Sequence, residues 1–307
     1  MLSSLPRPLI GIGLKLASTM VFAMMVALVK LTGGRLPTTE VVFFRNAFAL
    51  LPVFLMVWSM GHLGDLATGR PLIHVTRALS GVAAMTLWFA SLQRMHIAEA
   101  QAIVFAAPIL VVVLSALILR ETVRIYRWSA VIVGFVGVVI MLSPHIDAAR
   151  MLAGDDRSIG ALMALASALF MALAVIQVRS LVKTEKTGAI VLYFSLLATL
   201  LSGAILPFNW VTPSAYDATL LVAAGFLGGL GQILFTQSFR YADASVIAPI
   251  EYMSLIWIVI LGYILFGDLP EPTMWIGAPF VISAGVFIAW RERKRSPVAP
   301  PPDIRTP

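Results

Sequence analysis

The chain has 307 residues, of which 60% are hydrophobic and 12% charged, with a net charge of +7 and no cysteine. Ordinary soluble domains have about 45–50% apolar and about 25% charged residues, so this composition is typical of an integral membrane protein. The absence of cysteine excludes disulfides, thiolate metal sites and cysteine nucleophiles.

Ten apolar segments follow one another along the chain, and each is near the length of about 20 residues that spans a bilayer. The predicted spans are 9–30, 38–59, 71–92, 98–119, 126–143, 159–179, 188–206, 216–238, 244–266 and 273–290. The fifth is the shortest and the second and third contain arginines, so nine spans are the alternative. The first lacks a small-x-small exit motif, so we interpret it as a membrane helix and not as a cleaved signal peptide.

The Lys and Arg residues between the spans predict the orientation. With the N-terminus inside, 14 of the 22 Lys and Arg residues lie in cytoplasmic segments and 5 in the opposite loops. Positive charge favours the cytoplasmic side, so both termini are predicted to be cytoplasmic, in a bacterial inner membrane. The proline-rich segment 291–307 is predicted to be a disordered cytoplasmic tail. Its basic residues follow an apolar run directly and do not indicate a nucleic-acid partner.

The chain also contains an internal repeat. A shift of 147 residues aligns Glu121 with Asp268 and Trp128 with Trp275, and a shift of 149 aligns Lys30 with Arg179. Each half then has five spans, and an odd number inverts the second half in the membrane. We therefore predict an all-α integral membrane protein of ten transmembrane helices in two inverted five-helix repeats, 9–143 and 159–290.

Inverted repeats are typical of secondary transporters, whose substrate site lies near the midplane between the halves. A channel, a membrane sensor or a membrane enzyme is the alternative. The four histidines show no metal-ligand spacing, and no Gly-rich phosphate loop or nucleophile elbow is present. We therefore expect no enzyme, no cofactor and no metal site. The expected partners are a small-molecule substrate and the lipid bilayer, for a monomer or a homodimer.

Blocks 91–142 and 238–288 share a short loop, a helix beginning with small residues, a proline within the helix, an acid, a tryptophan and a Gly-rich last helix. In this the chain resembles the drug/metabolite transporter superfamily, in particular its ten-helix branch built from two EamA-type repeats. The resemblance covers residues 9–290. The segments "EVVFFRNAFALLP" and "RALSGVAAMTLWFASL" are most similar to bacterial riboflavin transporters and to carriers of S-adenosylmethionine or related metabolites.

Charged and polar residues inside the spans are the candidates for the substrate site, because a charge in the hydrocarbon layer costs about 2.5–3.5 kcal/mol. Glu251 is the first candidate, as a proton-titrating or substrate-binding carboxylate; the alternative is a structural ion pair with Arg77 or Arg45. The two arginines could bind substrate or snorkel to the interface. Gln101, Gln232 and Gln237 could contact substrate or join helices.

Prolines and aromatic residues complete the candidate site. Pro108 and Pro249 interrupt the fourth and ninth spans, where each is expected to kink the helix beside the cavity or within the packing. Aromatic side chains could stack on a flat ring, or pack in the core, at Phe44, Trp88, Phe105, Tyr193, Tyr252 and Trp257. We predict a secondary transporter of a small metabolite, with riboflavin uptake as the first hypothesis. The alternatives are an exporter of amino acids or related metabolites, a carrier of the S-adenosylmethionine type, and a channel or sensor.

Overall fold

The structure, a computed structural model, describes residues 7–60, 66–118, 125–143, 155–182, 184–208, 210–241 and 248–295. Within these residues the secondary structure is helical, and no strand is present. The first half contains α1 (Arg7–Leu31), α2 (Thr38–Met60), α3 (Pro71–Leu92), α4 (Ile97–Val104), α5 (Ala107–Ile118) and α6 (Ile125–Leu142). The second contains α8 (Asp156–Leu181), α9 (Thr187–Gly203), η3 (Leu206–Phe208), α10 (Ala215–Tyr241), η4 (Ala248–Tyr252), α12 (Met253–Phe266) and α13 (Pro272–Arg295).

The described helices form ten apolar spans. Six of them (α1, α2, α3, α8, α9 and α10) have the length and hydropathy of a full membrane span. The shorter apolar helices lie at Ile97–Val111, Trp128–Met141, Ile250–Phe266 and Pro272–Phe287. The protein is thus an all-α integral membrane protein, and its described helices make up ten spans. The last helix continues to Arg295, five residues into the segment predicted as tail; residues 296–307 lie outside the described ranges.

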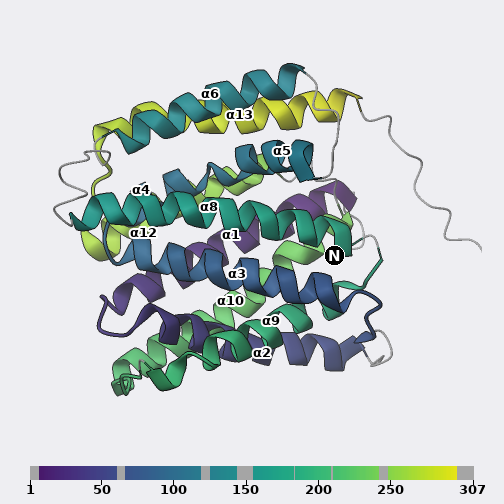
Figure 1. Ribbon diagram of the computed structural model, residues 1–307, viewed down its shortest axis with the longest axis vertical. Helices are drawn as coiled ribbons and strands as arrows, with labels where there is room; N and C mark the ends of the chain where they lie inside the picture. Colours follow the sequence, from purple (N-terminus) through teal and green to yellow (C-terminus); the bar gives the residue numbers. More distant parts are fainter. Residues whose placement is uncertain are drawn as a thin grey trace, which may run out of the picture.

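The helices lie side by side along one direction, with α6 and α13 at one edge of the bundle and α2 and α9 at the opposite edge (Figure 1). The first helix of each half packs against the third helix of the other, as α1 with α10 and α8 with α3. Arg157, at the start of α8, lines the same cavity as Lys30, at the end of α1. Because α8 is the equivalent of α1, the second half runs in the opposite direction.

Side-chain contacts follow the same repeat. Ser91 Oγ donates a hydrogen bond to the carbonyl of Trp88, and Ser238 Oγ donates one to the carbonyl of Phe235, so the same hydrogen bond forms at positions shifted by 147 residues. A second correspondence crosses between the halves. Arg45 lies against Gly228, while Phe194, 149 positions after Arg45, lies against Gly81, 147 positions before Gly228. The repeat therefore describes packing as well as sequence.

Two spans are interrupted at equivalent places. In the first half α4 ends at Val104 and α5 begins at Ala107. Pro108 has no amide hydrogen, and its ring would clash with the carbonyl of Val104 four residues earlier, which explains the break. In the second half the 3-10 helix η4, which contains Pro249, precedes α12. Residues 242–247, where the ninth span was predicted to begin, lie outside the described ranges.

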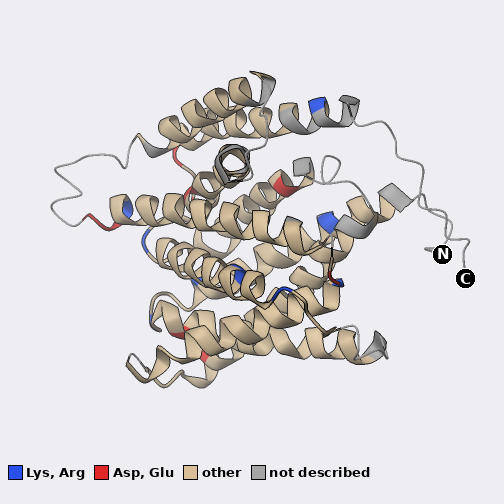
Figure 2. Ribbon diagram, turned by 45° about the vertical axis from the view of Figure 1, so that its right-hand side comes forward, with Lys and Arg blue, Asp and Glu red and all other residues tan. Residues whose placement is uncertain are grey.

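The outer surface of the bundle is apolar. Most of the helical ribbon bears neither Lys and Arg nor Asp and Glu (Figure 2). Large hydrophobic side chains are exposed there, for example Phe54, Trp58 and Ile125. Small residues are used where helices meet: Gly137 of α6 lies so close to Gly277 of α13 that a Cβ atom on either glycine would approach the other's carbonyl oxygen to about 2.7 Å or less. An apolar exterior and close contacts through glycine are typical of helices packed in lipid.

Candidate functional site

The two helix breaks meet in the centre of the bundle. Phe105 follows the last residue of α4, Tyr252 precedes the first residue of α12, and their rings pack edge to face with centroids 5.1 Å apart. These residues are 147 positions apart, the same shift that relates the two halves. The contact therefore joins equivalent residues of the two halves. Gly285 of α13 leaves room for the Tyr252 ring, because a Cβ atom there would overlap it.

A partly buried ion pair lies beside these breaks. The ammonium group of Lys15, on α1, donates a hydrogen bond to the carboxylate of Glu251, in η4. The Lys15 side chain is 3% exposed and the Glu251 side chain 39% exposed. Lys15 is thus enclosed, whereas the carboxylate can be reached from one side. The ion-pair alternative for Glu251 predicts Arg77 or Arg45 as the partner, and this prediction is wrong: the partner in the structure is Lys15.

Aromatic side chains surround the pair. The Lys15 ammonium lies 4.1 Å from the ring centroid of Phe235 on α10, a cation–π contact. One turn further along α1, Thr19 accepts a hydrogen bond of 3.3 Å from the indole nitrogen of Trp257 on α12. The site therefore combines α1 of the first half with η4, α10 and α12 of the second. It offers one cation, one accessible carboxylate and aromatic walls.

The two arginines predicted from the spans are buried at a second place between the halves. Arg45 is 2% exposed and Arg77 is 7% exposed, so neither reaches the interface by snorkelling. Arg45 Nη1 donates a 2.9 Å hydrogen bond to the side chain of Asn46. The guanidinium of Arg77 lies 4.2 Å from the ring centroid of Phe194 on α9.

The other predicted residues are spread over the bundle. Gln101 is buried on α4, with its side-chain oxygen unbonded, and Trp88 stacks on Phe89 with centroids 5.6 Å apart. Gln237 is half-buried on α10. Tyr193 packs on the ring of His74, with centroids 4.7 Å apart. Glu251, Tyr252 and Trp257 of the predicted set lie at or beside the Lys15 pair, and Pro249 lies in the same 3-10 helix as Glu251.

Ion pairs gather at the end of the bundle where α1 ends and α8 begins, here named the ion-pair end. Three of them join the two halves: Lys30 with Asp268 at 3.0 Å, Arg35 with Asp217 at 2.6 Å, and Arg94 with Asp156 at 3.8 Å. A fourth pairs Arg157 with Glu271 at 3.0 Å. Every described Lys and Arg of the loops at this end is thus neutralised.

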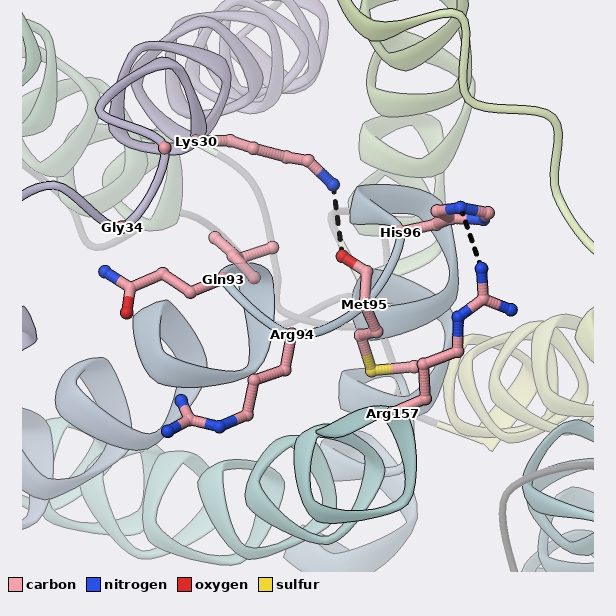
Figure 3. A pocket seen from close by; sticks show the side chains of 9 residues that line it. Lys30, Gly34, Gln93, Arg94, Met95, His96 and Arg157 are labelled. Atoms are coloured by element: carbon pink, nitrogen blue, oxygen red, sulfur yellow. Dashed lines mark hydrogen bonds between the residues drawn. The ribbon is translucent and has the colours of Figure 1, made fainter. Parts of the chain in front are cut away.

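A cavity of about 230 Å³ opens at the ion-pair end (Figure 3). Its lining includes Lys30, Arg94, His96 and Arg157. The His96 Nε2 atom lies 3.3 Å from Arg157 Nη2. Because arginine only donates, Nε2 accepts, and the His96 proton is on Nδ1, 3.1 Å from Glu99. This cavity is polar and lies at the ion-pair end of the bundle. It is separate from the Lys15–Glu251 pair.

The opposite end of the bundle holds a smaller polar cluster. Glu185, between α8 and α9, accepts hydrogen bonds from Thr68 and from the buried ring of His74. Burial acts to raise the pKa of Glu185, but these hydrogen bonds and the charges of His74 and Arg70 outweigh it and hold the pKa below its ordinary value. Arg70 also donates to the hydroxyl of Ser180 at 3.1 Å, so this cluster links α3 to α8 and its loop.

Sequence reasoning missed Lys15 and Phe235 as site residues. Lys15 had the same signal as Glu251, a lone charge in an apolar run. Phe235 had no signal of its own, because an aromatic residue in a membrane helix is usually core or interface.

Comparison with known proteins places this geometry in context. The sequence profile described as "EamA-like transporter family" matches residues 9–143 and 158–290. The S-adenosylmethionine uptake transporter of Rickettsia prowazekii is 31% identical, over 86% of this chain and 87% of that protein. The riboflavin transporter of Vibrio cholerae is 28% identical, over 85% and 86%. The pseudopaline exporter of Pseudomonas aeruginosa is 27% identical, over 91% and 95%. A solved crystal structure with 19% identity superposes with a TM-score of 0.64, over 94% of this chain and 99% of that one.

Proposed function

We propose a function from one premise: this chain belongs to the EamA-like transporter family, and its relatives with assigned activities are membrane transporters. The proposed function is secondary transport, by alternating access, of a small metabolite with an amino-acid head group, of which S-adenosylmethionine is the first candidate. The observation that supports this substrate class is the Lys15–Glu251 pair between the halves, in which Lys15 is buried and Glu251 is accessible.

The pair fits an amino-acid head group because of charge balance. A ligand cation alone would take Glu251 and leave Lys15 buried without a partner, which costs several kcal/mol. A ligand with both an ammonium and a carboxylate can insert between the two side chains and leave each of them paired. The accessible face of Glu251 gives such a ligand a point of first contact. The aromatic rings of Phe235 and Trp257 then offer surfaces for a flat ring attached to the head group.

Riboflavin is the second candidate substrate. Relatives named riboflavin transporters are 28% identical to this chain, and aromatic walls suit a flat neutral ring. A neutral substrate, however, would leave the Lys15–Glu251 pair without a role in binding. For this reason we rank it after an amino-acid-bearing substrate, reversing the order that the sequence alone suggested.

The proposed orientation places the ion-pair end outside a bacterial inner membrane and both termini in the cytoplasm. The positive-inside tendency supports it, because most Lys and Arg residues lie at the opposite end or in the tail. The described cations at the ion-pair end are matched by acids, so they add little net positive charge there.

The test is uptake of labelled S-adenosylmethionine into proteoliposomes that contain the purified protein. We expect saturable uptake that unlabelled S-adenosylmethionine competes and that internal substrate accelerates. Glu251→Gln should lower the uptake rate at least about tenfold, equivalent to ~1.4 kcal/mol. Glu271→Gln is the matched control, because this acid has its ion pair at the surface; its rate should stay within about twofold of wild type, in keeping with the small worth of exposed pairs.

Three outcomes would contradict the proposal. Riboflavin uptake without S-adenosylmethionine uptake would favour the second candidate and remove the need for an amino-acid head group. Flux that neither saturates nor responds to internal substrate would indicate a channel. Equal losses in Glu251→Gln and Glu271→Gln would show that the central pair has no special part in transport.

A further inference from the structure

Arg45 and Arg77 differ from the other charged residues of the bundle, because both are buried and neither has an acidic partner among the residues that the structure describes. The Nε atom of Arg45 and the Nε and Nη1 atoms of Arg77 are buried without any hydrogen-bond acceptor in the described chain. Buried polar groups are hydrogen-bonded in the great majority of cases. Three such donors on two neighbouring cations are therefore an exception that calls for a ligand.

Arg45 and Arg77 lie on neighbouring helices, because α2 and α3 pack against each other and both pack against α9, whose Phe194 contacts Arg77. The charge of Arg45 acts on Arg77. Like charges in a buried place repel each other, so packing alone does not explain their proximity. An anion between them would convert this repulsion into attraction to a shared partner. The structure thus has the charge distribution of an anion site.

The surroundings leave room for this arrangement and hold it at the interface between the halves. Arg45, on α2, fits against α10 because residue 228 is glycine; a Cβ atom there would lie 2.8 Å from Arg45 Nε. Arg77, on α3, lies over the ring of Phe194, which comes from α9. Each arginine is therefore positioned by the other half, in the region where inverted-repeat carriers bind substrate.

We propose that Arg45 and Arg77 form a buried subsite for a small oxyanion, the carboxylate or phosphate group of a metabolite or a free anion of the same chemistry. A guanidinium group donates two parallel hydrogen bonds to a carboxylate or phosphate, a match of geometry as well as charge. The unbonded nitrogens supply the donors. Asn46 fixes the orientation of Arg45 through its side-chain oxygen.

This subsite is separate from the Lys15–Glu251 pair. Gly228, beside Arg45, also lies against Met25, which is ten residues after Lys15 on α1, roughly 15 Å along the helix axis. A single amino-acid head group cannot reach both places. The inference rests on the proposed function only for its part in transport: the arginines would hold an anion that is exchanged for S-adenosylmethionine or, for a different amino-acid-bearing substrate, a second anionic group of that substrate.

The experiment measures thermal unfolding of the full-length protein in detergent while inorganic phosphate or acetate is titrated at constant ionic strength. Wild type should show a saturable rise in Tm. Arg77→Leu should lose this rise, and its Tm without anion should equal or exceed that of wild type, since an unpaired buried charge is removed. Arg77→Lys keeps the charge but not the fork of donors, so its midpoint should move to at least about tenfold higher anion concentration. Arg157→Gln, a surface control, should respond as wild type does.

The outcomes decide the proposal without reference to transport. The same Tm rise in Arg77→Leu, or no rise in wild type, overturns it. A lower Tm in Arg77→Leu without anion would show that Arg77 is a structural residue, and would also overturn it. If Arg77→Leu does not fold, Arg77→Lys and Arg45→Gln carry the same test through their anion midpoints. Competition of the anion with labelled substrate then separates a group on the substrate from an exchanged anion, and absent uptake would count against the proposed function alone.

Discussion

The Lys15–Glu251 pair and its counterpart in the other half have the same position in the fold but opposite chemistry. The shifts that relate the halves place Lys15 on Ala164 and Glu251 on Val104. Ala164 and Val104 are buried apolar residues. The helix break thus forms at both equivalent places, although one place has the Lys15–Glu251 ion pair and the other has only the apolar residues Ala164 and Val104 at the corresponding positions. The charged pair is not a requirement of the fold.

The same contrast holds for the other buried charges. Arg45 corresponds to Phe194 and Arg77 to Ala224, and both counterparts are buried and apolar. A charge at the centre of a membrane helix costs about 2.5–3.5 kcal/mol on insertion scales. An apolar residue occupies the equivalent position in the other half, so the fold does not require a charge there. The insertion cost of the charge is therefore not offset by a gain in stability. The comparison therefore assigns the charged residues to function and the apolar counterparts to packing.

The largest expected effect comes from breaking the Lys15–Glu251 pair on one side only. Glu251→Val leaves Lys15 enclosed without its carboxylate and should lower the free energy of unfolding by about 3–5 kcal/mol. The double variant Lys15→Met with Glu251→Val gives this half the apolar chemistry of its counterpart, and should recover most of that loss. Denaturant unfolding of both variants and of Lys15→Met measures the coupling.

Transport separates stability from function in the same variants. The recovered double variant should remain inactive, because it has neither charge for a substrate. An active double variant would show that the pair serves packing after all. Additive losses in the double variant would show that Lys15 and Glu251 do not depend on each other.

The fold was predictable from the sequence because its causes are local. Apolar length predicted the ten helices, and the repeat predicted their inversion, since both are properties of the sequence alone. The break before Pro108 follows from the missing amide and the ring of proline. The end of the last helix was less predictable, because its basic residues continue as helix to Arg295 instead of ending it.

The partner of Glu251 was not predictable in the same way. Glu251 and three cations, Lys15, Arg45 and Arg77, lie well away from the ends of the predicted spans. Depth narrows the choice: Lys15 is eight residues into α1, roughly 12 Å from the end near which Glu251 enters the bundle. Arg77 is at a similar depth in α3, so depth alone does not identify which cation pairs with Glu251. Only lateral packing, in which α1 contacts η4 and α12, resolves it.

The contrast at Arg45 can be sharpened with two glycines of α10. In Gly225→Ala the new Cβ atom would lie 3.0 Å from the carbonyl oxygen of Phe44, a backbone atom of α2 that cannot move alone. We expect it to lower the free energy of unfolding by about 2–3 kcal/mol. In Gly228→Ala the nearest atoms belong to the flexible side chains of Arg45 and Met25, so the loss should be about 1 kcal/mol or less.

The second glycine variant should nevertheless alter the arginine subsite more than the first. Thermal unfolding with and without phosphate compares them: Gly228→Ala should reduce the anion-dependent rise in Tm, whereas Gly225→Ala should lower the whole curve and keep that rise. The reverse ranking would show that the position of Arg45 against α10 does not matter for anion binding.

An effect smaller than that of Gly225→Ala is expected at Glu185, whose cluster with His74 corresponds to Leu36 and Leu221 in the repeat. Its pKa is held below the ordinary value, so its ionised form stabilises the fold above about pH 4.5, and this contribution is lost as the pH falls through the lowered pKa. Glu185→Gln should therefore lower the free energy of unfolding by about 1–2 kcal/mol at pH 7, and the difference from wild type should shrink as the pH falls through the lowered pKa. Thr68→Val removes one hydrogen bond to the Glu185 carboxylate. The pH at which the stabilisation by the ionised carboxylate is half lost should therefore be higher in this variant than in wild type. A difference that stays constant with pH would show that Glu185 acts through packing, as its leucine counterpart does, and not through its charge.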